Sequence, residues 1–318
     1  MLVQFEIPTL ILAGRGAHAE APAELRRVGA NRVLVVTDPG IVKSGVLDLV
    51  TGALDRGNLP YAVFDRVQPQ PTCGGVQEAF ALYRAQGCDA LLAVGGGSSM
   101  DTAKGVAILA TNGGRPQDYS GFDKFTNQPV PMVAVPTTAG TGSEVSAVAS
   151  LVDEETGAKL SLRHTRYNRA RIAILDPIMV KTLPRHQAII TGLDALAHNV
   201  EAYTSKESSP FSDAVAAQGI TLIGRHLRSF VEDRGNEKAA EAMQAASTLG
   251  GVSLSAAGTG NSHCIARFLA AAHHMEHGMA CAVTLPWVVG FNHESEPRKF
   301  SYVARALGEP GGGLTDEE

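Results

Sequence analysis

Four side chains in the second half of the sequence have the types and spacing of a metal site. Asp194 and His198 stand four residues apart in TGLDALAHNVEAY, so on a helix they project from the same face. Alone, this pair is more typical of a solvated aspartate beside a hydrogen-bonded histidine. His263 and His277 supply two further imidazoles, and Gly278 predicts a change of chain direction that lets both rings converge. Three imidazoles and one carboxylate suit Fe²⁺, Zn²⁺ or a similar divalent ion. The ligand types alone do not discriminate between these metals.

A glycine-rich run, AVGGGSSMDTAKGVA, predicts an anion site. Gly95–Gly97 end a buried strand, and Ser98 stands near the start of the helix that contains Asp101. A helix N-terminus favours an anion, and glycines let a diphosphate approach closely. The alternative is a tight turn with Ser98 as a helix cap. A second loop, VPTTAGTGSEVS at 135–146, also follows a strand, and both should reach the carboxyl edge of the sheet, where such folds bind ligands.

Asp38 ends the strand NRVLVVTD, directly before Pro39. A carboxylate at this place accepts hydrogen bonds from ribose hydroxyls and repels a 2′-phosphate, which favours NAD over NADP, with NADP not excluded. The alternative is an aspartate that caps the following helix. The sequence leaves both interpretations open.

The elements that must position these residues fall into two parts. In the first part, β-branched runs alternate with helical patterns near 45–56 and 75–86, which predicts a parallel sheet covered by helices. The predicted strands are NRVLVVTD, YAVFDRV, CDALLAVGGG, VPMVAVPTT and ARIAILDP. After Asp176-Pro177, Ala-rich helical segments continue to Ala306. We therefore expect an α/β nucleotide-binding domain at 1–180 and an all-α metal-binding domain at 181–318.

The composition of the 318 residues limits the partners. A formal net charge of -5 and 5% aromatic residues argue against nucleic-acid binding, because no basic stripe is present to displace counterions. Four scattered cysteines do not suit a disulfide framework. The start of the sequence resembles neither a signal peptide nor a membrane span. We expect a soluble cytoplasmic protein that binds small molecules and no membrane.

Five motifs in order carry a family resemblance: GGGSSMDTAK, PTTAGTGSEVS, LDP, GLDALAHNVEAY and HGMACAVTLP. The sequence resembles the iron-containing, group III alcohol dehydrogenases from near Phe5 to about Gly308. This resemblance implies the dehydroquinate synthase-like fold, with NAD(P) and a metal in a cleft between two domains, and a homodimer. It implies that the metal, Fe²⁺ or Zn²⁺, polarises the oxygen of a small primary alcohol or aldehyde while hydride passes to or from the nicotinamide.

The resemblance also implies roles for individual residues. The metal ligands would be Asp194, His198, His263 and His277. The nucleotide would contact a larger set, comprising Gly96, Gly97, Ser98 and Asp101 at the diphosphate, Thr137, Thr138 and Thr141 along the cofactor, Asp38 at the ribose and Lys159 nearby.

Two features depart from the family pattern. Arg267 stands where relatives commonly carry a further histidine beside the substrate, and its guanidinium would suit an anionic aldehyde, unless it faces solvent. The sequence also stops at Glu318, whereas relatives continue with further helices, so part of the usual helical domain is absent from it. The alternatives are a maleylacetate reductase-type, glycerol dehydrogenase-like or dehydroquinate synthase-like enzyme, and a non-catalytic nucleotide-binding remnant.

Overall fold

A computed structural model describes residues 4–273 and 275–309 of the chain. Two compact units are formed, each from separate pieces of the sequence. The sheet unit contains 8–137 and 143–182. The helical unit contains the described residues of 1–7, 138–142 and 183–318.

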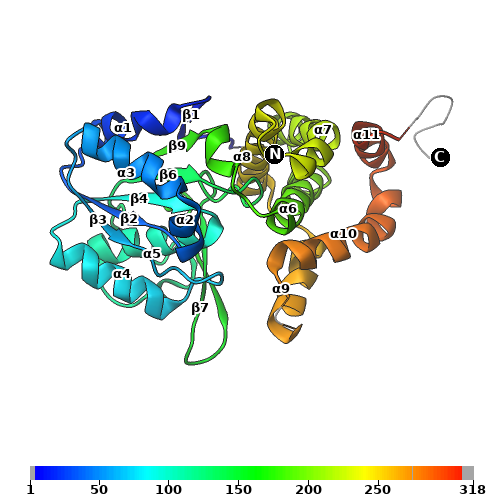
Figure 1. Cartoon of the computed structure of the whole chain (residues 1–318). Helices are drawn as coiled ribbons and strands as arrows, with labels where there is room; N and C mark the ends of the chain where they lie inside the picture. The colour runs from blue at the N-terminus through cyan, green and yellow to red at the C-terminus, as the bar shows by residue number, and fades with distance from the viewer. Residues whose placement is uncertain (1–3, 274, 310–318) are drawn as a thin grey trace. The chain divides into compact units, whose positions relative to one another are not determined.

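A six-stranded parallel sheet forms the centre of the sheet unit, with the strand order β1-β9-β6-β4-β2-β3 (Figure 1). Its strands are β1 Leu10–Ala13, β2 Val33–Val36, β3 Tyr61–Phe64, β4 Ala90–Gly95, β6 Met132–Pro136 and β9 Ile172–Leu175. Five of them lie within the predicted runs, and β1 was not predicted. The residues of β2, β4, β6 and β9 are buried throughout, as expected for strands covered on both faces.

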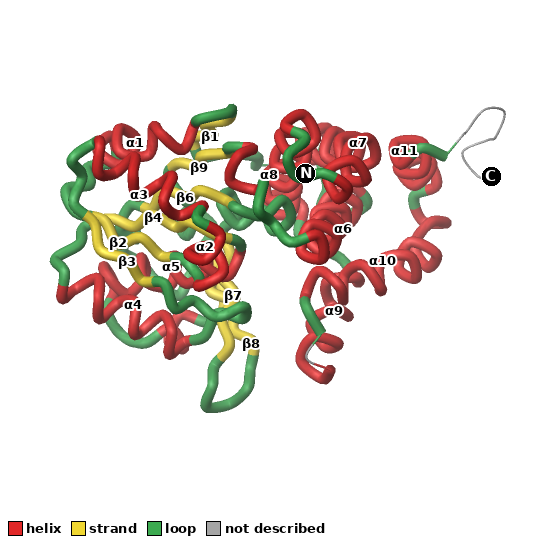
Figure 2. The backbone as a smooth tube through the Cα atoms, in the orientation of Figure 1, coloured by secondary structure: helices red, strands yellow, loops and turns green. Residues whose placement is uncertain are grey.

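Helices cover both faces of this sheet (Figure 2). The helices of the sheet unit are α1 Ala21–Arg27, α2 Pro39–Ser44, α3 Val46–Arg56, α4 Cys73–Ala85 and α5 Gly97–Asn112, with short 3₁₀ turns η1 Ala17–Glu20, η2 Pro116–Tyr119 and η3 Pro177–Val180. Leu34 belongs to a core that includes residues of α4 and α5. The next residue, Val35, belongs to a second core that includes residues of α1 and α3. The alternation of side chains along a strand thus divides the apolar residues between two cores.

A second, three-stranded sheet with the order β5-β8-β7 was not predicted from the sequence. Its strands are β5 Gly121–Phe122, β7 Val148–Val152 and β8 Lys159–Arg163. β7 and β8 form an antiparallel pair, and burial alternates along β7. Such half-buried strands lack the continuous apolar runs of the main sheet, so they give a weaker signal.

The helical unit consists of α6 Arg185–Tyr203, α7 Pro210–Glu232, α8 Glu237–Ala257, α9 Asn261–His273, α10 His277–Asn292 and α11 Pro297–Leu307, with η4 His293–Ser295. Its apolar core takes residues from α6, α7, α9, α10 and α11. Among the described residues, no helix combines the length and the hydropathy needed to cross a bilayer. The helical prediction for this part of the chain is confirmed.

Candidate metal centre and nucleotide-binding loop

Helix α6 carries three ionisable side chains on one buried face. Asp194, His198 and Glu201 are separated by one and two helical turns, and their exposed fractions are 3%, 6% and 5%. The predicted helical spacing of Asp194 and His198 is confirmed. Their burial also decides against a solvated aspartate at this position.

The structure brings Asp194 together with both later histidines. Oδ1 of Asp194 lies 3.6 Å from Nε2 of His263 on α9 and 3.9 Å from Nε2 of His277 at the start of α10. The buried thiol of Cys281 joins them, with Sγ 3.8 Å from Nε2 of His277. The four donor atoms lie within 4.8 Å of one another. His198 is not a member of this group of four, but its ring stacks on that of His263 at a centroid distance of 4.4 Å.

Sequence reasoning missed Glu201 and Cys281, although their spacing gave a signal. Glu201 follows His198 by three residues, and Cys281 follows His277 by four, so each shares a helix face with a predicted ligand. Glutamate is common on exposed helix faces and cysteine on buried ones, both without any role at a metal. Spacing alone therefore does not select them.

Two hydrogen bonds orient the histidines. Oε2 of Glu201 lies 2.5 Å from Nδ1 of His263, and the carbonyl oxygen of Gly140 lies 3.3 Å from Nδ1 of His198. Because a carbonyl oxygen can only accept, Nδ1 of His198 must donate, which places the lone pair on Nε2. Histidine ligands of metals are commonly held by such contacts to their second nitrogen.

Gly278 acts differently from the prediction. It lies inside α10, and its backbone does not turn the chain. A Cβ at this position would collide with the carbonyl oxygen of Ile190 on α6 and lie 2.9 Å from the carbonyl carbon. The glycine therefore allows α10 to approach α6, and this close packing brings His277 toward Asp194.

The charges of the site shift the pKa values of its members. Burial raises the pKa of Asp194, but the adjacent His198, His263 and His277 outweigh burial and hold it well below its ordinary value. Burial lowers the pKa of His263, whereas Asp194, Cys281 and Glu201 raise it well above 6.5 on balance. Burial raises the pKa of the Cys281 thiol to about 11. The centre thus stabilises a negative aspartate and a positive charge beside it.

The donor atoms also fit a divalent ion. Oδ1 of Asp194 and Nε2 of His263 are buried and have no hydrogen-bond partner among the described residues. Buried polar atoms are rarely left without a partner unless an ion or water satisfies them. Carboxylate, imidazole and thiol are ligands of iron and zinc.

The glycine-rich loop lies at the carboxyl edge of the main sheet. In the register of β4 and β6, Gly95 stands beside Pro136, so both predicted loops leave the sheet from neighbouring strands, as expected. The cap of α5 is Gly96, with no side-chain hydrogen bond, and the helix begins at Gly97. The alternative in which Ser98 caps this helix is therefore wrong.

Asp38 caps α2, and it also lies beside the glycine-rich loop. Its Oδ1 accepts hydrogen bonds from the backbone of Gly40 and Ile41, at 2.8 and 3.1 Å. Its Oδ2 lies 3.5 Å from the place where a Cβ on Gly95 would stand. The capping interpretation is confirmed, and the second oxygen faces the loop, so a role at the ribose is compatible with it.

Asp101 is committed to contacts within the sheet unit. Its Oδ1 accepts from the hydroxyl of Ser143 at 2.8 Å, and its Oδ2 accepts from the backbone of Ser150 at 2.9 Å. Lys104 lies 3.8 Å away. The carboxylate thus ties the glycine-rich helix to the second loop at Ser143 and to β7 at Ser150.

The remaining predicted cofactor residues fall in different surroundings. Thr137 is buried in the sheet unit, and its hydroxyl has no hydrogen-bond partner among the described residues. Thr138 and Thr141 belong to the segment that clusters with the helical unit and are partly exposed. Lys159 begins β8 with an exposed side chain.

Arg267 lies on α9, one helical turn after His263, and its side chain is exposed. The adjacent Phe268 is 77% exposed. The i, i+4 spacing to His263 holds as expected. Exposure at this position agrees with the solvent-facing alternative.

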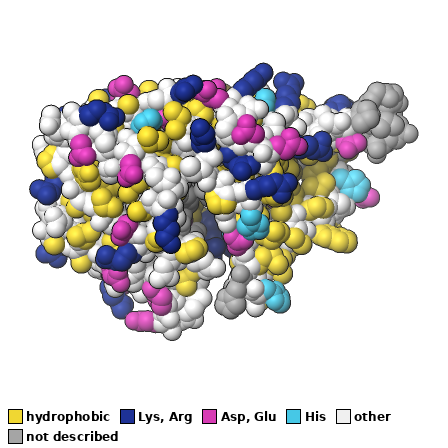
Figure 3. All heavy atoms as spheres, viewed as in Figure 1, with side chains coloured by type: hydrophobic (Ala, Val, Ile, Leu, Met, Phe, Trp, Pro, Cys, Tyr) yellow, Lys and Arg dark blue, Asp and Glu magenta, His cyan; other side chains and the backbone are white. Residues whose placement is uncertain are grey.

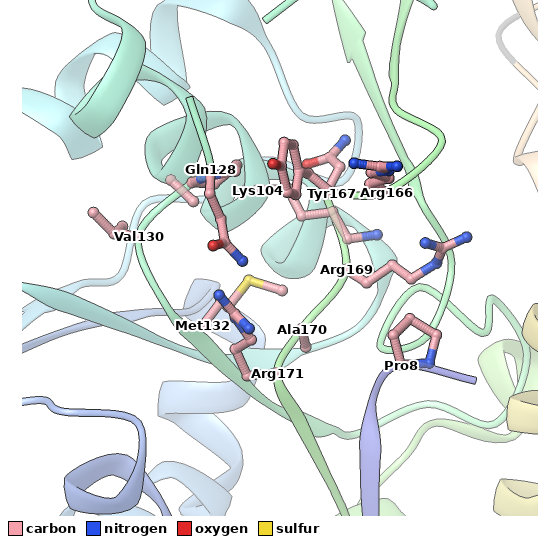
Figure 4. Close-up of a pocket in the computed structure, with 13 residues that line it drawn as sticks. Pro8, Lys104, Gln128, Val130, Met132, Arg166, Tyr167, Arg169, Ala170 and Arg171 are labelled. Carbon is pink, nitrogen blue, oxygen red and sulfur yellow. The ribbon is translucent and has the colours of Figure 1, made fainter. Parts of the chain in front are cut away.

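A basic pocket of about 70 Å³ in the sheet unit is separate from the glycine-rich loop (Figure 4). Lys104, Arg166, Arg169 and Arg171 contribute to its wall, and none of its lining residues is acidic. In Figure 4, Arg171 and Gln128 extend toward each other across it. Its lining contains none of the residues predicted to bind the nucleotide.

Comparisons with known proteins agree with this architecture. Residues 8–177 match the family described as iron-containing alcohol dehydrogenase, and residues 188–318 match the C-terminal domain of the Fe-containing alcohol dehydrogenase family. The chain is 35% identical to the NAD-dependent methanol dehydrogenase of Bacillus methanolicus over 99% of its own length and 82% of that protein.

Two solved structures are similar throughout. A 1,3-propanediol oxidoreductase is 37% identical, with a TM-score of 0.96 over 100% of this chain and 83% of the other. A sulfoacetaldehyde reductase from Bifidobacterium kashiwanohense, in complex with NAD⁺, is 29% identical, with a TM-score of 0.89 over 100% and 84%.

A parallel sheet unit with a glycine-rich loop and a helical unit with a buried donor cluster define a metal-assisted oxidoreductase. The chain belongs to the iron-containing alcohol dehydrogenase family. The fold expected from the sequence is confirmed. The chain is accordingly an NAD-dependent oxidoreductase that acts on alcohols, and the interpretation as a non-catalytic remnant is set aside.

Proposed function

We propose that this enzyme interconverts a small primary alcohol and its aldehyde, with Asp194, His198, His263 and His277 as the metal ligands. The observation that carries the proposal is the buried cluster in which Asp194 Oδ1 and His263 Nε2 lack hydrogen-bond partners. When bound, Fe²⁺ or Zn²⁺ supplies Lewis-acid polarisation of the substrate oxygen. Glu201 and the Gly140 carbonyl keep two histidines in position for this ion.

The proposed nucleotide site belongs to the glycine-rich loop. Gly96, Gly97 and Ser98, at the uncapped start of α5, support binding of the diphosphate through backbone N–H groups. Asp38 lies beside this loop and favours NAD(H) over NADP(H). We assign supporting roles at the cofactor to a further set, Asp101, Thr137, Thr138, Thr141 and Lys159. We also propose the division into a nucleotide-binding domain at 1–180 and a metal-binding domain at 181–318.

We propose Arg267 as a contact for an anionic group on the aldehyde. Its place one turn after His263 supports this, as does the similarity to a sulfoacetaldehyde reductase, whose substrate is an anionic aldehyde. Arg267→His should reduce kcat/KM for acidic semialdehydes more than for neutral aldehydes of similar size. Arg225→Gln, at an exposed position of α7, is the matched control. If Arg267→His kept the wild-type ratio of kcat/KM for acidic and neutral aldehydes, the proposed role of Arg267 would be refuted.

We propose that the enzyme is a homodimer and cytoplasmic. On α10, Val283, Trp287 and Phe291 follow one another at four-residue spacing and are 49%, 81% and 80% exposed. Hydrophobic side chains gather over this helix in Figure 3. An exposed apolar stripe of this kind supports burial against a second copy. Light scattering on the purified protein measures the oligomeric state, and a monomer at micromolar concentration would exclude the dimer.

Metal analysis combined with NADH and NADPH assays across an aldehyde panel tests the proposed function. We expect about one iron or zinc per chain, faster turnover with NADH, and aldehyde-dependent oxidation of the coenzyme. Asp194→Asn should abolish activity while binding of NADH is retained, because the aspartate belongs to the metal cluster. Asp233→Asn, exposed at the end of α7, should match wild type. Activity without bound metal would contradict the proposal.

A further inference from the structure

We propose that the sulfur of Cys281 is a further ligand of the divalent ion, in addition to the proposed ligands Asp194, His198, His263 and His277. This inference rests on the proposed metal site and adds a donor to it. No sequence motif or family match assigns a role to this residue. If correct, the centre of this enzyme contains sulfur as well as oxygen and nitrogen donors.

The spacing of the donor atoms carries the inference. Ligands at about 2.0–2.3 Å from a tetrahedral ion lie about 3.3–3.8 Å from one another. The structure gives 3.6 Å for Asp194 Oδ1 to His263 Nε2, 3.9 Å for Asp194 Oδ1 to His277 Nε2, and 3.8 Å for Cys281 Sγ to His277 Nε2. These separations are close to the edges of a coordination tetrahedron. The sulfur therefore stands at the distance of a further donor to the same ion, in addition to the proposed ligand His198.

Cys281 is held in this place by its helix. It follows His277 by four residues on α10, so both side chains lie on the same face. The hydroxyl of Ser262, next to His263 on α9, lies 3.3 Å from the carbonyl oxygen of Cys281 and connects the two ligand-bearing helices. Cys281 has no exposed surface. The contact between α9 and α10 thus positions both His263 and Cys281 before any ion binds.

The unsatisfied atoms around the thiol point independently to an ion. Asp194 Oδ1 and His263 Nε2 are both in the same group of donors as Cys281 and have no hydrogen-bond partner among the described residues. If Cys281 were buried only to fill the apolar core, unpaired polar atoms would not be expected beside its sulfur. In the alternative, Cys281 only fills space in the core, where free cysteine is common.

Coordination through sulfur releases one proton and affects which metals the site prefers. The metal–sulfur bond forms as the thiol proton is released to solvent, with no change in oxidation state. Thiolate ligands favour zinc and its borderline-soft neighbours over magnesium or manganese. We therefore expect Cys281 to contribute to the affinity for Zn²⁺ and Co²⁺.

Cobalt substitution of the full-length protein tests the proposal. Titration of the metal-free protein with Co²⁺ should give visible d–d absorption together with a near-ultraviolet thiolate-to-cobalt charge-transfer band. Cys281→Ser and Cys281→Ala should lose the near-ultraviolet band and bind Co²⁺ at least about tenfold more weakly. Cys264→Ser is the matched control, because Cys264 follows His263 directly but is exposed and lies outside the donor group.

The outcomes separate this inference from the proposed metal site. Stoichiometric d–d absorption in wild type without the charge-transfer band overturns the role of Cys281 and leaves the other ligands in place. Persistence of the band in Cys281→Ser or Cys281→Ala also overturns it. If wild type binds no Co²⁺ and contains no iron or zinc, both the inference and the proposed metal site fail.

Discussion

The carboxylate of Glu201 on α6 lies 2.5 Å from Nδ1 of His263 on α9, and both side chains are buried. The same carboxylate accepts the backbone N–H of Ser262, so it fixes the start of α9 as well as the imidazole ring. Through this contact α6 determines where Nε2 of His263 points, namely toward Asp194 on the same helix. Glu201 therefore organises the donor cluster from outside the predicted ligand set.

Glu201→Gln should weaken metal binding by about 10- to 100-fold, because the loss of the carboxylate makes His263 a less basic and less well oriented ligand. Competition titration with a chromophoric chelator measures the affinity. Glu241→Gln, on the exposed face of α8, is the control and should leave it unchanged. Equal affinities in Glu201→Gln and wild type would show that the contact only stabilises the fold.

Substitutions of Asp38 separate its cap from its proposed role at the ribose. Asp38→Ala removes the hydrogen bonds to Gly40 and Ile41 and should lower the free energy of unfolding by about 0.5–2 kcal/mol. Asp38→Asn keeps a capping side chain and should change it little. Both variants should lower the ratio of kcat/KM with NADH to that with NADPH, because both remove the negative charge. If neither variant changed the ratio of kcat/KM with NADH to that with NADPH, Asp38 would act only as the cap of α2.

Gly278→Ala should destabilise the helical unit by about 1–3 kcal/mol and weaken metal binding, because the added Cβ meets the Ile190 carbonyl and moves the start of α10. Urea denaturation and metal titration measure the two effects. Gly290→Ala in the same helix is the control, because nothing lies within 4 Å of its Cβ position. It should gain about 0.5–1 kcal/mol from helix propensity. Similar results for both variants would contradict the close-packing explanation.

Buried Lys104 should make stability depend on alkaline pH. Burial lowers its pKa from 10.5 to about 8, against the attraction of Asp101 and Glu144. Between these pH values the unfolded chain holds a proton that the folded protein has released, so the free energy of unfolding should rise with pH. Relative to Lys104→Met, wild type should gain stability from about pH 8 to 10.5 in urea denaturation. A constant difference between the two proteins across this range would contradict the shift.

The sequence by itself determined five of the six strands of the main sheet and the helix face that carries Asp194 and His198. Continuous apolar runs such as VLVV and ALLAVG indicate strands buried on both faces, because runs this short that are followed closely by Gly or Pro favour strands over helices. The spacing of Asp194 and His198 placed both on one helix face, and five ordered motifs indicated the family. The three-stranded sheet escaped prediction because its half-buried strands, VASLV and KLSLR, place polar residues between the apolar ones and lack the continuous apolar runs of the main sheet.

Only the tertiary structure decided which side chains meet. Cys281 is one of four scattered cysteines in the sequence, and its sulfur reaches the donor group because α10 packs closely against α6 at Gly278. Glu201 acquires its partner because α9 begins beside α6. Periodicity along the chain fixes the face of a single helix, but contacts between residues 60 to 90 positions apart arise from helix packing, which no local pattern encodes.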